Sequence, residues 1–226
     1  LAAEYLPAST GSDVGGDFYD VYAVGDGERG ATSWLVAIGD VCGTGAAAAA
    51  RTGLLRDVLR VLVREGRLLP EAVATLNDVM METADPLQFC TLATATVRST
   101  HPSDRPGLTV DLALAGHLQP VLVRADGPTE LVGTFGTAVG LIPTVRVGSS
   151  THRLNLGDTL LLYTDGVTER RRGRELFGTS RLRDAAGPLA GYPADVMAAR
   201  LRSTTINFSV EEPRDDIAIL VLRNDN

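Results

Sequence analysis

The chain has 226 residues, with 44% hydrophobic and 22% charged side chains, which suits one large domain or two small ones with a sizeable buried core. Its net charge of −7 disfavours nucleic acid as a partner, because a phosphate backbone attracts basic side chains. The sequence contains no apolar run near the roughly 18 residues of a membrane span and no signal-peptide pattern. Cys42 and Cys90 form neither a zinc pattern nor a disulfide framework, so we expect a cytoplasmic protein.

The first half of the chain predicts three strands followed by two helices. Short apolar runs bounded by Gly or Pro indicate strands near residues 1–8, 14–24 and 34–38. From Ala46 to Arg64 the apolar residues recur at helical spacing, and Pro70 opens a second helix that runs to about residue 84. The chain opens within a strand and without an initiator Met. We therefore expect a single domain, residues 1–226, cut from a longer protein.

The second half is rich in strands that follow one another directly. Helical patterns return only near residues 180–186 and 194–205. The predicted strands lie at residues 89–97, 108–115, 120–124, 152–156, 159–164 and 217–222. Because strands join strands while the helices come in two blocks, the pattern predicts an α+β fold with largely antiparallel sheets, rather than a doubly wound parallel sheet.

Four acidic residues occupy the same kind of position, where a buried strand meets a turn. They are Asp17, Asp40, Asp165 and Asp215. Each carboxylate is able to project from the end of a sheet into a shared cleft, where cations would be needed to offset their repulsion. Carboxylates without a His or Cys cluster favour hard cations such as Mg²⁺ or Mn²⁺. For any one of these acids, ordinary turn chemistry is an equally simple interpretation.

Five segments around these acids resemble the motifs of bacterial PPM-type phosphatases, in the branch of the sporulation phosphatase SpoIIE and the stress-response phosphatase RsbU. They occur in family order and cover nearly the whole chain. The segments are VGGDFYD (residues 14–20), GDVCGTG (39–45), AGHLQP (115–120), LGDTLLLYTDGVTE (156–169) and DDIA (215–218).

The resemblance implies a fold and a metal site. The fold would be an α-β-β-α sandwich of two mainly antiparallel sheets flanked by helices. By motif position, Asp40 would bridge two Mn²⁺ or Mg²⁺ ions, and the carbonyl oxygen of Val41 would be a neighbouring ligand. The catalytic metal site would be completed, directly or through water, by Asp17, Asp165 and Asp215. Asp216 would support these ligands without touching a metal.

The resemblance also implies a reaction, the metal-dependent hydrolysis of phosphoserine or phosphothreonine on a protein. A hydroxide bridging the two cations would attack phosphorus, since a bound divalent cation lowers the pKa of water. The expected substrate is a phosphorylated anti-sigma-factor antagonist, and the full-length protein is expected to carry an N-terminal sensor region. Two alternatives remain, namely a phosphoprotein-binding regulatory module with weak or no catalysis and a cation-binding structural domain.

Several residues near the motifs have two interpretations. Cys42 stands where eukaryotic relatives carry a His proposed as general acid, so the leaving oxygen would take its proton from elsewhere. His117 is a candidate acid, although a hydrogen-bonded structural histidine is the simpler interpretation. The arginine run is a candidate for binding the phosphoprotein, although such a run is commonly a solvated face. The substrate-binding candidates in this run are Arg170, Arg171 and Arg172.

Overall fold

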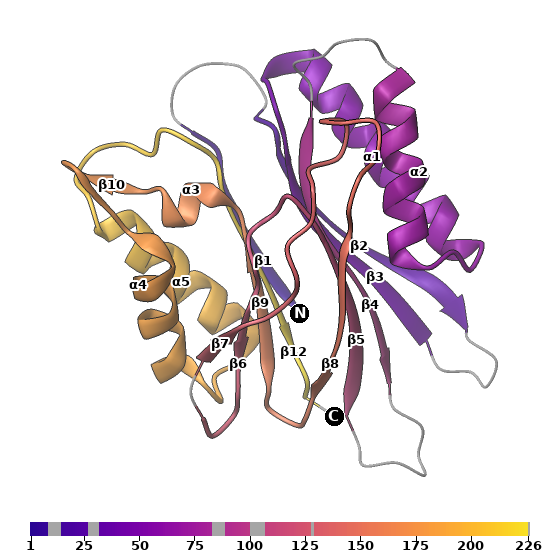
Figure 1. The fold of residues 1–226 in the computed structure, drawn as a ribbon. Coiled ribbons are helices and arrows are strands. Elements are labelled where there is room, and N and C mark those ends of the chain that lie inside the picture. The colour runs from indigo at the N-terminus through magenta and orange to yellow at the C-terminus, as the bar shows by residue number, and fades with distance from the viewer. Residues whose placement is uncertain (9–14, 27–31, 83–88, 100–106, 128, 226) are drawn as a thin grey trace.

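The computed structural model describes residues 1–8, 15–26, 32–82, 89–99, 107–127 and 129–225. Two five-stranded sheets face each other across the middle of the molecule, and helices cover the outer face of each (Figure 1). Within these residues, the neighbouring strands of each sheet pair antiparallel. The structure therefore confirms the predicted α+β sandwich of two antiparallel sheets.

The first sheet joins the N-terminal strand to strands from the second half of the chain. Its order is β1-β12-β9-β6-β7. The strands are β1 (Ala2–Leu6), β12 (Ile217–Arg223), β9 (Thr159–Tyr163), β6 (Val121–Val123) and β7 (Thr129–Leu131). The short strand β7 was not predicted, because three residues are too few to show a period.

The second sheet is built from strands that are mostly consecutive in the sequence, in the order β2-β3-β4-β5-β8. These strands are β2 (Asp17–Asp26), β3 (Thr32–Val41), β4 (Cys90–Ser99), β5 (Leu108–Ala115) and β8 (Gly148–Leu154). The last of them ends two residues earlier than predicted, because Asn155 enters a turn in which its backbone N–H donates to the Asp158 carboxylate at 2.9 Å.

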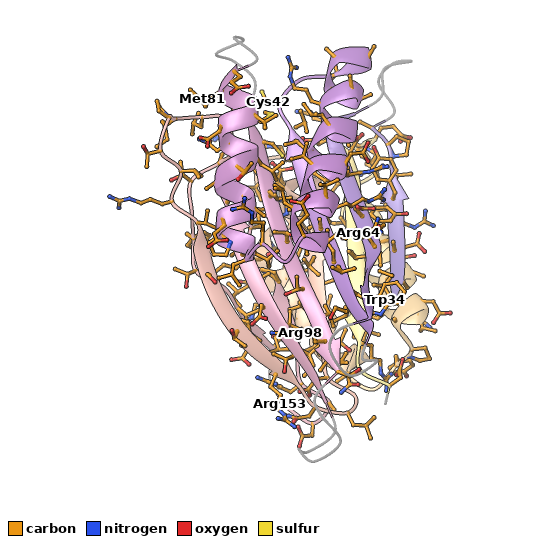
Figure 2. The ribbon with its side chains drawn as sticks, turned by 90° about the vertical axis from the view of Figure 1, so that its right-hand side faces the viewer. Trp34, Cys42, Arg64, Met81, Arg98 and Arg153 are labelled. Carbon is orange, nitrogen blue, oxygen red and sulfur yellow. The ribbon has the colours of Figure 1, made fainter. Side chains whose placement is uncertain are left out.

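Helices α1 (Gly45–Arg64) and α2 (Leu69–Glu82) cover the second sheet, close to their predicted bounds. Figure 2 views the molecule from their side, with Cys42 and Met81 at one end and Arg98 and Arg153 towards the other. The first sheet is covered by the remaining helices and lies beside a small hairpin. These elements are α3 (Asp165–Thr168), β10 (Arg171–Arg172), β11 (Glu175–Leu176), α4 (Gly178–Ala186), η1 (Gly187–Leu189) and α5 (Ala194–Asn207).

The buried core forms three layers, because the central strands are apolar on both faces. In β9, Leu160 and Leu162 pack between the two sheets, whereas Leu161 and Tyr163 pack against the helices α4 and α5. Strand β3 divides its side chains in the same way between the middle layer and the layer under α1 and α2. Continuous apolar runs are the sequence signature of such doubly covered strands. No described helix is both long and apolar enough to cross a membrane.

Candidate metal centre

Three of the four predicted acids meet where the ends of the two sheets converge. Asp17 is the first residue of β2 and is paired across the strands with Asp40 of β3. Asp165 follows β9 in the first sheet and begins α3. One carboxylate oxygen from each of these three residues lies within 4.8 Å of the other two. Antiparallel pairing in one sheet and a strand end in the other thus bring the carboxylates together.

Crowding and burial disfavour the charged state of these carboxyl groups. Burial raises the pKa of Asp17 to about 9, and the negative charges of Asp40, Asp215 and Asp165 add to the effect. The pKa of Asp40 rises to about 6, again mainly through burial and then through the negative charges of Asp165, Asp215 and Asp216. The pKa of Asp165 is also raised, mainly by burial and then by the negative charge of Asp215. A bound cation would oppose both causes, because it supplies charge and ligands at once.

Two oxygens in this cluster are buried without a hydrogen-bond partner in the described residues. They are Oδ2 of Asp17 and Oδ1 of Asp165. Buried polar atoms are nearly always paired, so unpaired ones in a cluster of acids call for an explanation. A divalent cation provides one, since carboxylate oxygens are the ligands that Mg²⁺ and Mn²⁺ prefer. The residues present therefore fit the metal that the motifs imply.

Gly16 lets two chain segments approach at this centre. A Cβ atom at Gly16 would lie 2.0 Å from the carbonyl oxygen of Val41 and 2.6 Å from Oδ1 of Asp40. The carbonyl oxygen of Gly16 in turn accepts a hydrogen bond of 3.0 Å from the backbone N–H of Val41. The Val41 carbonyl is thus held beside the Asp40 carboxylate, which is where the motif places a metal ligand.

Asp215 and Asp216 differ in what they touch. Asp215 is exposed, lies outside the group of three oxygens within 4.8 Å, and is close enough for its charge to raise the pKa of Asp17, Asp40 and Asp165. Asp216 is buried and accepts hydrogen bonds from the Tyr5 hydroxyl at 2.7 Å and the Ala8 N–H at 2.8 Å. It therefore fixes the segment after β1 against the centre, a contact that the sequence did not indicate.

His117 is a structural link between the two sheets. Its Nε2 lies 3.1 Å from the carbonyl oxygen of Tyr163. Because a carbonyl oxygen only accepts, Nε2 carries the hydrogen and donates the hydrogen bond. Its Nδ1 then accepts from the Thr91 hydroxyl at 2.9 Å. Burial lowers the pKa of His117 to about 4, which leaves the ring neutral near pH 7. Thr91 is paired with Asp40, and Tyr163 precedes Asp165 by two residues, so the imidazole braces the strands that carry both acids.

The three candidate arginines point in three different directions. Arg170 is buried, and its guanidinium donates to the carbonyl oxygens of Ser209, at 3.1 Å, and Glu211. Arg172 donates to Glu175 at 2.9 Å and stacks over the Phe208 ring, with 4.5 Å to the ring centre. Arg171 is exposed and lines a pocket. The run is thus partly structural, because Arg170 and Arg172 have partners within the protein.

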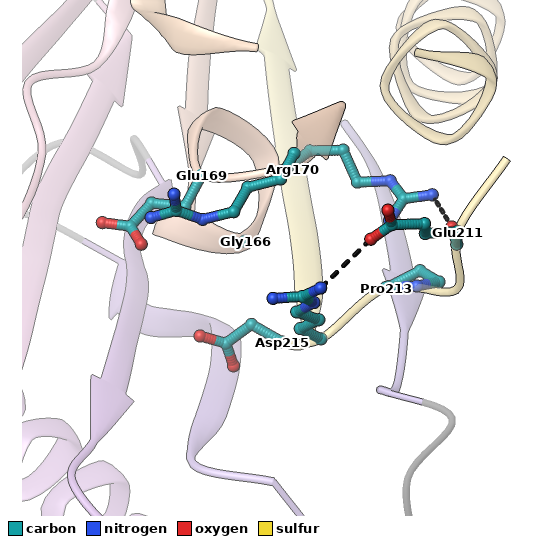
Figure 3. A pocket seen from close by; sticks show the side chains of 8 residues that line it. Gly166, Glu169, Arg170, Glu211, Pro213 and Asp215 are labelled. Atoms are coloured by element: carbon teal, nitrogen blue, oxygen red, sulfur yellow. Dashed lines mark hydrogen bonds and ion pairs between the residues drawn. The ribbon is translucent and has the colours of Figure 1, made fainter. Parts of the chain in front are cut away.

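That pocket opens beside the acidic centre, and Figure 3 shows it from close by. Of the residues in its wall, Gly166 directly follows Asp165 in the sequence, and the charge of Asp215 is close enough to raise the pKa of Asp165. The remaining wall comes from the end of α3, from β10 and from the segment before β12. These lining residues are Glu169, Arg170, Arg171, Glu211, Pro213 and Arg214.

The two-sheet sandwich with acidic residues at one end has the fold of PP2C phosphatase domains. Residues 30–225 match the model of the Stage II sporulation protein E (SpoIIE) family, and the chain belongs to that family. The matched region omits Asp17, which reaches the centre by pairing with Asp40.

Known proteins resemble the chain over most of its length. Protein IcfG of Synechocystis is 28% identical over 212 residues, which is 80% of this chain and 31% of that protein. The RsbU and RsbW domains of Rv1364c from Mycobacterium tuberculosis are 30% identical, with a TM-score of 0.74 over 97% of this chain and 58% of that one. The phosphatase domain with a regulatory fragment of SpoIIE from Bacillus subtilis has a TM-score of 0.82 at 20% identity, over 99% and 61% of the two chains. This chain thus spans about a third of IcfG and under two thirds of the other two.

Proposed function

We propose that this domain hydrolyses phosphoserine or phosphothreonine on a protein and requires two Mn²⁺ or Mg²⁺ ions. The observation that carries the proposal is the meeting of the Asp17, Asp40 and Asp165 carboxylates, with two buried oxygens that have no hydrogen-bond partner in the described residues. An all-oxygen donor set selects hard divalent cations. Membership of the SpoIIE family supports the phosphatase reaction over a structural cation site.

The proposed ligand roles follow the positions of the side chains. Asp40 is paired with Asp17 across the strands, and both its carboxylate and the Val41 carbonyl lie beside Gly16, so it is proposed to serve both ions. Asp17, Asp165 and the Val41 carbonyl oxygen would be further ligands, and Asp215 would bind through its exposed carboxylate or through water. Asp216 keeps its carboxylate on Tyr5 and Ala8, and is proposed to hold the centre in place without binding metal.

The catalytic residues are therefore the acids, without a nucleophilic side chain. Bound divalent cations lower the pKa of water and offset the charge of a phosphate. The carboxylates fix the position of these charges, and Gly16 keeps the site open to the Val41 carbonyl. Because the neutral His117 is buried and fully occupied by Thr91 and Tyr163, we propose that solvent protonates the leaving oxygen.

The wider setting is also a proposal. The resemblance of the motifs to the SpoIIE and RsbU branch supports a phosphorylated anti-sigma-factor antagonist as the proposed substrate. Two cysteines without a disulfide pattern support a cytoplasmic location. Because the chain covers only part of its relatives, residues 1–226 are proposed to be one domain of a longer protein with an N-terminal sensor region.

A phosphate-release assay tests the proposed function directly. Protein treated with a chelator is supplied with Mn²⁺, Mg²⁺ or no metal, and is given p-nitrophenyl phosphate and a phosphoserine protein. We expect release only with metal, and loss of most turnover in Asp40→Ala. Binding of the phosphoprotein without release would instead favour the regulatory module, and release without metal would contradict the proposal.

A further inference from the structure

Arg171 has a different environment from the arginines on either side of it. Arg170 is occupied by backbone carbonyl oxygens and Arg172 by Glu175 and the Phe208 ring. The backbone of Arg171 pairs with Leu176, but its guanidinium has no hydrogen bond or ion pair within the part of the chain that the structure describes. An exposed guanidinium that lines a pocket and has no internal partner is free to bind a ligand.

The hairpin that carries Arg171 is held firmly in place. The backbone N–H of Phe177 donates to the carbonyl oxygen of Arg170 at 2.8 Å and closes the base of the hairpin. Glu175 accepts from both Arg172 and Arg181, and the guanidinium of Arg181 also lies 5.2 Å from the centre of the Phe208 ring. Arg171 is therefore presented from a fixed support, which reduces the entropy lost when it binds a partner.

Three arginines line the pocket, and among the described residues Arg171 is the one whose guanidinium has no partner within the protein. Arg214 also lines the pocket, but its guanidinium donates to Glu211 at 3.2 Å. Arg170 is turned into the protein. The acids Glu169 and Asp215 line the same pocket, and neither forms an ion pair with Arg171 among the described residues. An anionic group is the ligand that best matches the charge and the donor geometry of the free Arg171 guanidinium.

We propose that Arg171 binds an acidic side chain next to the phosphorylated residue of the substrate protein. This inference rests on the proposed phosphatase function. A phosphoryl group placed at the carboxylates of Asp40 and Asp165 has Gly166 and Asp215 beside it, and the pocket wall continues from there to Arg171. The polypeptide flanking the phosphoserine therefore passes along this wall. A guanidinium matches a carboxylate well, because its N–H groups form paired hydrogen bonds with both oxygens.

The test compares substrates that differ only in the flanking charge. Three phosphoserine peptides carry Asp, Gln or Lys residues beside the phosphoserine, and p-nitrophenyl phosphate has no flanking residue. Each is assayed with saturating Mn²⁺ at low salt, using wild type, Arg171→Ala and Arg171→Glu. The matched control is Arg174→Ala, which removes the same charge from the exposed turn of the same hairpin, away from the pocket.

We expect wild type to prefer the acidic peptide over the neutral one by roughly three- to tenfold in kcat/KM, the range of a partly exposed charged contact. Arg171→Ala should abolish this preference, and Arg171→Glu should shift it towards the Lys peptide. Arg174→Ala should keep the preference, and p-nitrophenyl phosphate should be hydrolysed equally by all four proteins.

Two results would overturn the inference while leaving the proposed function intact. One is an unchanged preference in Arg171→Ala. The other is an equal loss on all four substrates, which would mean that Arg171 contacts the phosphoryl group or supports the fold. If wild type released no phosphate from any substrate with either metal, the proposed function would fail, and this inference with it.

Discussion

Asp17 and Asp40 are direct partners in the antiparallel pairing of β2 with β3, so their side chains share one end of the second sheet. Asp165 approaches from the first sheet, and the three carboxylates lie within 4.8 Å of one another. The sandwich itself thus forces together charges that repel. Stability and metal binding are consequently linked at this centre, because a cation that binds only the folded protein stabilises it.

Asp17→Asn should separate metal binding from folding. Without metal, the change removes a buried carboxyl group crowded by three other acids, so we expect an equal or higher melting temperature, by about 2–4 °C for each kcal/mol gained. With Mn²⁺, the variant should lose most of the stabilisation and turnover of wild type. Thermal denaturation with a chelator and with Mn²⁺ measures both effects.

Asp78→Asn is the matched control for this prediction, since Asp78 is an exposed acid on α2, outside the carboxylate cluster. It should respond to Mn²⁺ as wild type does. A strongly destabilised Asp17→Asn protein in the absence of metal would show that Asp17 supports the fold in a way that repulsion does not describe.

The metal-free protein should lose stability as pH rises from about 4 to about 9. The folded-state pKa is raised to about 6 for Asp40 and about 9 for Asp17, from 3.8 in an unperturbed aspartate. Over this range the folded state binds more protons than the unfolded state, so the free energy of unfolding falls with increasing pH. The stabilising contribution of these protonated carboxyl groups is complete below about pH 4. It is lost as the pH rises past the pKa of Asp40, about 6, and then past that of Asp17, about 9.

Chemical denaturation at several pH values, with a chelator present, measures this slope. Asp17→Asn should flatten it, particularly between pH 6 and 9, because the group with the higher pKa is removed. Saturating Mn²⁺ should also oppose the slope, since the cation binds the ionised carboxylates. If the metal-free protein grew more stable over the same range, the raised pKa values would be wrong.

Gly16→Ala should damage the site more than the fold. Its Cβ would lie 2.0 Å from the Val41 carbonyl oxygen, so the backbone beside Asp40 must move. A displacement of about 1 Å in a catalytic site lowers the rate about a hundredfold. We expect a loss of that order in kcat and weaker activation by Mn²⁺, both measured in a metal titration of turnover.

Gly53→Ala provides the control for this substitution. Gly53 lies within α1, and an added Cβ there meets no atom within 4 Å. The change should leave turnover intact and stabilise the helix by up to about 1 kcal/mol. Equal activity in the two variants would contradict the proposed need for close approach at Gly16.

The sequence predicted much of this architecture because its signals are local. Apolar runs marked the strands, helical spacing marked α1 and α5, and the motif acids lie where strands end. The contact of Tyr5 with Asp216 joins residues far apart in the chain, and no local pattern encodes it. The inward turn of Arg170 was equally hidden, because its partners are carbonyl oxygens of a distant loop rather than acidic side chains.

A structural role and a catalytic role for His117 predict different dependences of kcat on pH. With its pKa near 4, the neutral imidazole does not titrate between pH 5.5 and 8, so it should leave no inflection in the kcat profile of wild type. His117→Ala would leave the Thr91 hydroxyl and the Tyr163 carbonyl oxygen without their partner, at a cost of about 1–3 kcal/mol for each buried group. Thr91→Val removes only the contact at Nδ1 and should destabilise the protein less.

Both variants should retain the shape of the wild-type pH profile, whatever their rate. Unfolding curves and kcat measured from pH 5.5 to 8 for the three proteins decide the matter. If an acidic limb present in wild type disappeared only in His117→Ala, the ring would be a proton donor in the reaction, and its place as a brace between Asp40 and Asp165 would be secondary.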